Sequence, residues 1–297
     1  MKKIVSVFIS VCMILAAFAG CSKSIDNDKE QTLDFSVTYD SHYQNYDASA
    51  ISAYENLCNA IINGEAEAKY NVRLLDYVNQ LYYTGFPLNA LVESVDILPD
   101  SSGVRINYKN DTETHLKLVS EFDARVDEIL KECGAGTVSS SRFVFNVYDY
   151  INKNFKIDNS VVSVYDVIMQ GRGVKSAVNS VFEYLILSGG GKASHTMNYD
   201  NAPNMISIVN FNNEWYYFDP AGEIEDNGGK ALKYFAMDDK RVGAYVSGQL
   251  TYTDGQTVGT VTDDKYSNLK DSSSFEDKDD EIDVILSDGE TFMLKLY

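Results

Sequence analysis

The sequence predicts an α+β protein that combines amphipathic helices with an antiparallel sheet. Between residues 54 and 188, apolar side chains recur mainly three or four positions apart, which is the spacing of helices. After residue 204, two strand-like segments flank a short polar turn, which is the pattern of an antiparallel hairpin. Helices and antiparallel strands that are segregated along the chain are typical of the α+β class.

The first third of the chain contains a helix pair and a strand pair. Residues 54–62 have helical periodicity, and Asn63-Gly64 is a suitable end for that helix. Residues 74–83 form a second predicted helix. Two predicted strands, 91–98 and 104–108, are joined by the polar turn 99–103.

Three further helical segments fill the middle of the chain. One amphipathic helix runs through residues 119–132 and ends at Cys133-Gly134, and another covers the segment 144–154. A third helix follows the stretch "GRGV" at 171–174. Its buried face is predicted to contain Val174, Val178, Val181 and Leu185, and three glycines at 189–191 end it.

The last third is predicted to be rich in strands. The segments "MISIVNF" and "EWYYFDP" flank Asn212-Asn213, and asparagine tolerates the positive φ of a tight hairpin turn. Residues 244–255 and 282–297 alternate like strands of a β appendage. The acidic, serine-rich segment 263–281 between them is expected to be a solvated loop, because it lacks the ligand spacing of a calcium-binding loop.

The first 20 residues are typical of an export signal. Two lysines precede an apolar run that is too short for a usual membrane span, and Phe18-Ala19-Gly20-Cys21 resembles a bacterial lipobox. We therefore expect residues 1–20 to be a lipoprotein signal peptide and residues 21–34 a flexible tether. Cys21 would carry the lipid, including a fatty acid such as palmitate. A plain secretory signal is the alternative.

Charge and cysteine content exclude several classes of function. The formal net charge of −19 argues against a nucleic-acid partner, because phosphate binding needs a basic surface. Beyond the signal and Cys21, only Cys58 and Cys133 remain, and the sequence leaves open whether they form a disulfide. No Cys or His cluster suggests a metal site, and no cofactor is expected.

Three segments together resemble the bacterial transglutaminase-like superfamily, whose core is papain-like. These segments are "YDYINKNFKID", "GRGVKS" at the start of a helix, and "EWYYFDPAG" at the end of the hairpin. The resemblance covers residues 140–240 and implies a transglutaminase-like domain there. Residues 35–139 would then form an N-terminal α/β region, and residues 241–297 a β-rich C-terminal appendage with the acidic loop.

The resemblance also implies a Cys-His-Asp triad that this sequence does not retain. The family places its cysteine nucleophile at the start of the helix, its histidine on the next strand and its aspartate before proline. Those positions are occupied here by Lys175, Asn204 and Asp219. An ion pair between Lys175 and Asp219 is one hypothesis for the altered site, and a turn role for Asp219 is another.

Three functions are compatible with this pattern. The favoured one is a membrane-anchored, extracytoplasmic lipoprotein with a catalytically inactive domain that binds a peptide, cell-wall material or an envelope protein. The others are an active amidase, protease or transglutaminase with a rearranged site, for which Ser176 beside Lys175 is a weak candidate nucleophile, and a purely structural envelope protein. The strand residues Trp215 and Tyr217, with Lys175 and Asp219, are candidates for a ligand groove, although core packing is the alternative for these aromatic rings.

Overall fold

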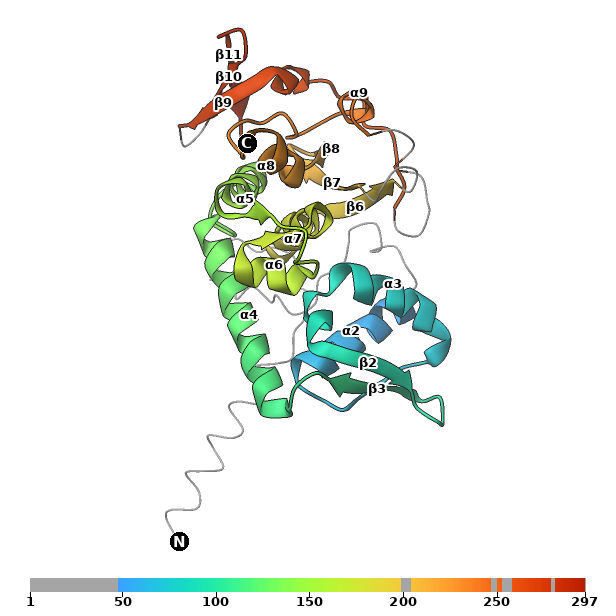
Figure 1. The fold of residues 1–297 in the computed structure, drawn as a ribbon. Helices are drawn as coiled ribbons and strands as arrows, with labels where there is room; N and C mark the ends of the chain where they lie inside the picture. The colour runs from blue at the N-terminus through green and yellow to red at the C-terminus, as the bar shows by residue number, and fades with distance from the viewer. Residues whose placement is uncertain (1–47, 199–203, 247–249, 253–257, 279–280, 297) are drawn as a thin grey trace. The chain divides into compact units, whose positions relative to one another are not determined.

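The computed structural model describes residues 48–198, 204–246, 250–252, 258–278 and 281–296 (Figure 1). The described residues belong to one compact unit that spans Phe35–Tyr297. The predicted signal peptide and tether, with Cys21, lie outside the described residues. The subdivisions expected at residues 139 and 240 stay predictions.

The chain has an α+β architecture with antiparallel sheets. The helices are α2 (Ala48–Ile62), α3 (Leu75–Gly85), α4 (Thr112–Glu132), α5 (Ser140–Asn154), α6 (Val164–Gln170), α7 (Lys175–Ser188), α8 (Pro220–Asn227) and α9 (Asp239–Gly243), with short 3-10 turns η2 (Val72–Leu74), η3 (Pro87–Leu91) and η4 (Ser267–Asp271). The strands are β1 (Glu67–Lys69), β2 (Val92–Ile97), β3 (Gly103–Tyr108), β4 (Lys156–Ile157), β5 (Arg172–Gly173), β6 (Ala193–Asn198), β7 (Asn204–Phe211), β8 (Glu214–Phe218), β9 (Ser272–Asp277), β10 (Glu281–Leu286) and β11 (Thr291–Lys295).

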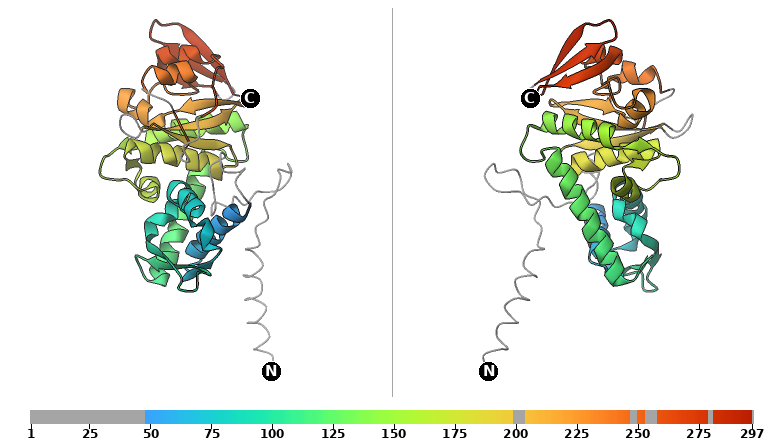
Figure 2. Two further views of the ribbon diagram at one scale, coloured as in Figure 1. Left: turned by 90° about the vertical axis from the view of Figure 1, so that its right-hand side faces the viewer. Right: turned by 60° about the vertical axis from the view of Figure 1, so that its left-hand side comes forward.

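Most of the described strands form three antiparallel sheets, in the orders β1-β3-β2, β6-β7-β8 and β11-β10-β9, and β4 pairs with β5 in a short parallel ladder. Helix α7 packs against β7 and β6, and α5 packs against α7 and α8, so that these helices cover the β6-β7-β8 sheet (Figures 1 and 2). Among the described residues, we find no helix with the length and apolar character that crossing a bilayer requires.

The predicted hairpin is confirmed, and its turn has the expected backbone conformation. β7 and β8 pair in antiparallel register, with Asn210 opposite Trp215. Asn212 and Asn213 connect the strands with φ values of 52° and 66°. Asparagine tolerates this left-handed conformation better than most residues, which is why the sequence signals the turn so clearly.

The main core is an aromatic cluster that the helices and the central sheet share. Its rings meet edge to face or tilted, at centroid distances such as 4.9 Å for Phe218–Phe235 and 5.6 Å for Phe182–Phe218. Such pairs contribute about 0.5–1.5 kcal/mol each beyond the area they bury. Helix α5 is joined to α8 across this core, because the Tyr148 hydroxyl donates to Glu223 Oε2 over 2.8 Å.

The C-terminal region is integrated into the same core. The Phe275 ring of β9 lies 5.7 Å from the ring of Phe145 on α5, and Tyr266 lies 5.6 Å from Phe211 on β7. The buried guanidinium of Arg241 donates to four backbone carbonyls, including that of Tyr266 at 3.1 Å. These contacts join the residues beyond 240 to the helices and strands that precede them.

One prediction for the C-terminal region was wrong, and a second falls partly outside the described residues. The segment 263–281 contains η4 and strand β9 rather than a continuous loop, because β9 pairs with β10 despite its acidic, serine-rich composition. In the described parts of 244–255, only Thr251 pairs, in a single bridge with Met197. Val246 and Leu250 are buried, and residues 247–249 and 253–255 lie outside the described residues.

Candidate functional site

The glycine turn before α7 is required by packing. Gly171 ends α6 in the left-handed conformation, with φ of 66°. A Cβ atom on Gly173 would lie 2.2 Å from Cγ2 of Val167, so no other residue fits there without a shift. Helix α7 then begins at Lys175, after Val174, which makes no side-chain capping bond. The turn therefore places Lys175 at the helix N-terminus, as the sequence predicts.

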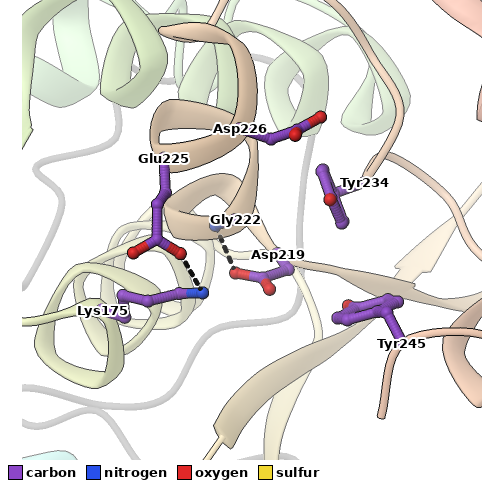
Figure 3. Close-up of a pocket in the computed structure, with 7 residues that line it drawn as sticks. All are labelled: Lys175, Asp219, Gly222, Glu225, Asp226, Tyr234 and Tyr245. Carbon is purple, nitrogen blue, oxygen red and sulfur yellow. Dashed lines mark hydrogen bonds and ion pairs between the residues drawn. The ribbon is translucent and has the colours of Figure 1, made fainter.

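Lys175 makes its ion pair with Glu225 rather than with Asp219. The Nζ atom of Lys175 lies 2.8 Å from Oε2 of Glu225 on α8 (Figure 3). Both side chains are substantially exposed, at 39% and 59%, so this pair stabilises the fold by at most about 1 kcal/mol. The hypothesis of a Lys175–Asp219 ion pair is corrected, because Asp219 has other partners.

Asp219 is a buried cap of helix α8. Its Oδ1 atom accepts a hydrogen bond from the Gly222 amide and another from Asn179 Nδ2, both at 2.8 Å. A Cβ on residue 222 would come within 2.6 Å of the Asp219 carboxylate, so glycine is needed for this cap. Asp219 therefore has the turn role that was its second hypothesis, because its carboxylate accepts a hydrogen bond from the backbone amide of Gly222.

Burial raises the pKa of Asp219 above its usual range. The hydrogen bonds from Asn179 and Gly222 and the nearby charge of Lys175 act in the opposite direction and offset part of this shift. A carboxyl group that is 4% exposed and bonded to two neutral donors is a structural element of the site. Asp219 is also much more deeply buried than Lys175 and Glu225 beside it.

Asn179 is the residue that sequence reasoning missed. It lies one turn after Lys175 on α7, with 2% exposure. Besides its bond to Asp219, its Nδ2 donates to the Met205 carbonyl at 2.6 Å, and its Oδ1 accepts from the Ala221 amide at 3.1 Å. One side chain thus joins α7, the start of β7 and the start of α8. The sequence offered one signal for this role, which is the position of the polar Asn179 beside the buried valines of α7.

Asn204 begins β7, where its backbone pairs with Asn198 across the sheet. Its side chain lies outside the part that the structure describes. The following residue, Met205, receives the Asn179 bond, which links the start of β7 to Asp219 through one side chain. Asn179 therefore bonds to the Asp219 side chain and to the residue after Asn204, and it lies one turn after Lys175 on α7.

A cavity of about 280 Å³ lies beside Lys175 and Asp219. Its wall consists of Lys175, Asp219, Gly222, Glu225, Asp226, Tyr234 and Tyr245 (Figure 3). The two tyrosine rings meet edge to face at 5.3 Å. The lining includes three carboxyl groups and one ammonium group, and Asp226 also pairs over 3.1 Å with Lys233, which lies outside the lining. The lining itself is therefore more acidic than basic. We call it the acidic pocket.

The aromatic candidates for the groove lie elsewhere. Tyr217 is buried, and its hydroxyl donates to Asp239 over 3.2 Å. Trp215 is 38% exposed and does not line the acidic pocket. Alternation predicted two buried and two exposed rings at 215–218, but three are buried, because Asp239 at the start of α9 lies against the Tyr217 hydroxyl on the face that was expected to be open.

The remaining thiols are poorly placed for nucleophilic chemistry. Cys58 and Cys133 are both free and buried. Burial raises the pKa of Cys133 to about 12 and that of Cys58 well above its usual value, so neither forms a thiolate readily at neutral pH. Among the described residues, no group of three or more His, Cys, Asp and Glu side chains is placed to hold a metal ion.

Comparisons with known proteins add little to this geometry. No protein-family model and no curated protein matches the sequence. A solved structure described as a "Putative Cysteine Protease from Cytophaga hutchinsonii" is 21% identical over 34% of this chain and 37% of that chain, with a TM-score of 0.27. At this TM-score the likeness assigns neither fold nor activity. The class of protein therefore follows from the structure of this chain alone: it is an α+β protein with antiparallel sheets and an acidic pocket at the start of α7.

Proposed function

We propose that this protein is a lipid-anchored, extracytoplasmic binding module with a transglutaminase-like, papain-like core that has lost catalysis. Anchoring would occur through an N-terminal lipid on Cys21, at the outer face of the cell membrane. The acidic pocket would bind an amino group of a peptide, of cell-wall material or of an envelope protein. The observation that carries this proposal is Lys175, held by Glu225 at the position where the resemblance expects a nucleophilic cysteine.

The residues around Lys175 support the loss of catalysis. An ammonium group with a carboxylate partner cannot attack a carbonyl as a thiolate does. The aspartate that would orient a histidine instead caps α8 and accepts from Asn179. Cys58 and Cys133 are buried, which argues against a rearranged thiol enzyme.

The composition of the acidic pocket supports an amino group as its ligand. Among the lining residues, Asp219, Glu225 and Asp226 outnumber Lys175, and a further cation close by is Lys233, which pairs with Asp226. Aromatic faces such as those of Tyr234 and Tyr245 also attract cations, by about 0.5–2 kcal/mol. A phosphate or carboxylate would meet repulsion there.

A peptide-binding experiment tests the proposal. We expect the peptide amide Gly-Gly-Lys to bind the purified full chain in calorimetry, and the same peptide with both amino groups acetylated to bind at least tenfold more weakly. Glu225→Gln should weaken binding of the free peptide. Glu121→Gln is the matched control, because Glu121 is also an exposed partner of a lysine, at 3.7 Å from Lys117. Equal binding of both peptides would refute the amino-group assignment.

Catalysis and anchoring are tested separately. The full chain should release no ammonia and form no isopeptide bond with a glutamine-containing peptide and a primary amine. Turnover that Lys175→Ala abolishes would overturn the loss of catalysis. In cells, labelled palmitate should be incorporated into the wild-type chain and not into Cys21→Ser, and incorporation into that variant would overturn the anchor.

A further inference from the structure

A second cavity, of about 390 Å³, opens on another side of helix α7. Ser176, Ala177, Ser180, Glu183, Tyr184 and Leu187 line it from α7, while His195 and Met197 contribute from β6 and Met205 from β7. The opposite wall comes from residues 83–89 and 162–164. It shares no lining residue with the acidic pocket. We call it the apolar pocket.

A buried ionisable pair forms part of the wall of the apolar pocket. Nδ1 of His195 lies 2.9 Å from Oε2 of Glu183, and the two side chains are only 2% and 6% exposed. Burying such groups is costly unless they are paired. The hydrogen bond fixes the plane of the imidazole ring, as carboxylate partners do for functional histidines. The pair thus presents an oriented polar group in a mainly apolar wall.

The rim of the same pocket contains the most exposed apolar side chains of the described residues. Val162 is 71% exposed and Tyr83 is 69% exposed, whereas the other large exposed apolar side chains range from 36% to 51%. Both line the apolar pocket. Exposed apolar side chains that gather at one cavity are typical of an interaction site, because a ligand that covers them removes apolar surface from water.

The lining selects an uncharged ligand with both apolar and amide character. Apart from the Glu183–His195 pair and tyrosine hydroxyls, the lining has no ionisable group, so no cation is available for a phosphate or carboxylate. A bare acyl chain would offer no hydrogen-bonding group to the hydroxyl groups of Ser176 and Ser180 on α7. A peptide segment supplies amide groups for these side chains and an apolar side chain for Phe86, Met197 and Met205.

We infer that the apolar pocket is a binding site for an uncharged peptide segment that inserts a bulky aliphatic or aromatic side chain, with His195 hydrogen-bonded to the peptide backbone. This site is distinct from the acidic pocket and does not depend on the proposed function. Met197 and Met205 suit such a site, because the flexible thioether side chain adapts to different apolar groups.

Nuclear magnetic resonance of methionine methyl groups tests this inference on the full chain. The probe is acetyl-Gly-Leu-Gly-amide, and acetyl-Gly-Asp-Gly-amide is its charged counterpart. We expect the leucine peptide to shift the methyl signals of Met197 and Met205 in a saturable manner and to leave those of Met169 and Met293 unchanged. The aspartate peptide should bind at least about tenfold more weakly, since a charge in an apolar site costs more than that difference.

Two valine substitutions provide the matched control. Val162→Glu places a charge at the exposed rim and should weaken binding of the leucine peptide by about tenfold or more. Val138→Glu, at another exposed valine that does not line the pocket, should leave binding unchanged. Folding of both variants is checked by circular dichroism, and neither side chain is part of the core. His195→Gln should also weaken binding, while the thermal midpoint reports any loss of fold.

Three outcomes would overturn the inference. The first is an absence of shifts at Met197 and Met205 with millimolar leucine peptide. The second is equal affinity for the leucine and aspartate peptides, and the third is equal affinity of Val162→Glu and Val138→Glu. Binding at the acidic pocket is monitored separately with Glu225→Gln, so failure of one site does not decide the other.

Discussion

Replacing Asn179 with alanine should destabilise the protein far more than the loss of one surface amide would. The side chain is almost fully buried and makes three hydrogen bonds, to the Met205 carbonyl, the Asp219 carboxylate and the Ala221 amide. Each buried partner left unsatisfied costs about 1–3 kcal/mol. Asp219 keeps its bond from Gly222, which limits the loss at that group. We therefore expect the free energy of unfolding to fall by about 3–5 kcal/mol.

Urea denaturation followed by far-ultraviolet circular dichroism measures this loss. Asn146→Ala is the control, because Asn146 is also a helical asparagine that is partly buried and makes a single bond, from Nδ2 to the Cys133 carbonyl at 3.0 Å. That variant should lose about 1 kcal/mol. If Asn179→Ala costs no more than Asn146→Ala, then the bonds of Asn179 do not hold α7, β7 and α8 together, and our description of the site is wrong.

Three further predictions concern charges and thiols near the site. Lys175→Met should change the free energy of unfolding by less than about 1 kcal/mol, because its pair with Glu225 is exposed, and a larger loss in urea denaturation would contradict this. For Asp219, a pKa raised in the folded state means that the folded protein binds the proton more tightly, so stability falls as pH rises from the unfolded pKa through the folded pKa. Asp219→Asn should remove this fall, so its stability relative to wild type should increase from pH 3.5 to pH 7 in denaturation curves, and a pH-independent difference would refute the shift. Cys58 and Cys133 should react with a thiol reagent at pH 7.5 at least about 100-fold more slowly in the native than in the unfolded chain, and rapid native labelling would show that the thiols are accessible.

Local sequence patterns predicted much of the secondary structure. The element that they did not predict, strand β9, depends on pairing with a strand elsewhere in the chain. The helix end at Gly64 and the turn at Asn212-Asn213 depend on positive φ, which the sequence signals directly. Strand β9 has an unpromising composition and exists because β10 offers it a partner. Composition does not reveal such a partner, since strand preference depends on the neighbouring strand more than on the residues themselves.

The candidate site was predictable in its position and not in its contacts. The sequence placed Lys175 at a helix start and Asp219 at a strand end, and the structure brings both to one pocket. It did not indicate that Lys175 would bond to Glu225, because long exposed side chains have many neighbours to choose from. It also did not single out His195 and Glu183, since burial and pairing of these residues are properties of the assembled fold.

The contacts of Arg241 and Phe275 with the central core have a consequence for how the chain opens. A region that shares its core with the preceding helices should exchange its amide hydrogens together with them, as one cooperative unit, rather than unfold first as an independent lobe. The amides of β10, which are paired on both sides, should then be protected to a similar extent as those of α5. A chain cut after residue 240 would lose the Arg241 bonds and the Phe275 and Tyr266 rings together. Such a fragment would therefore be prone to aggregation rather than being a smaller binding domain.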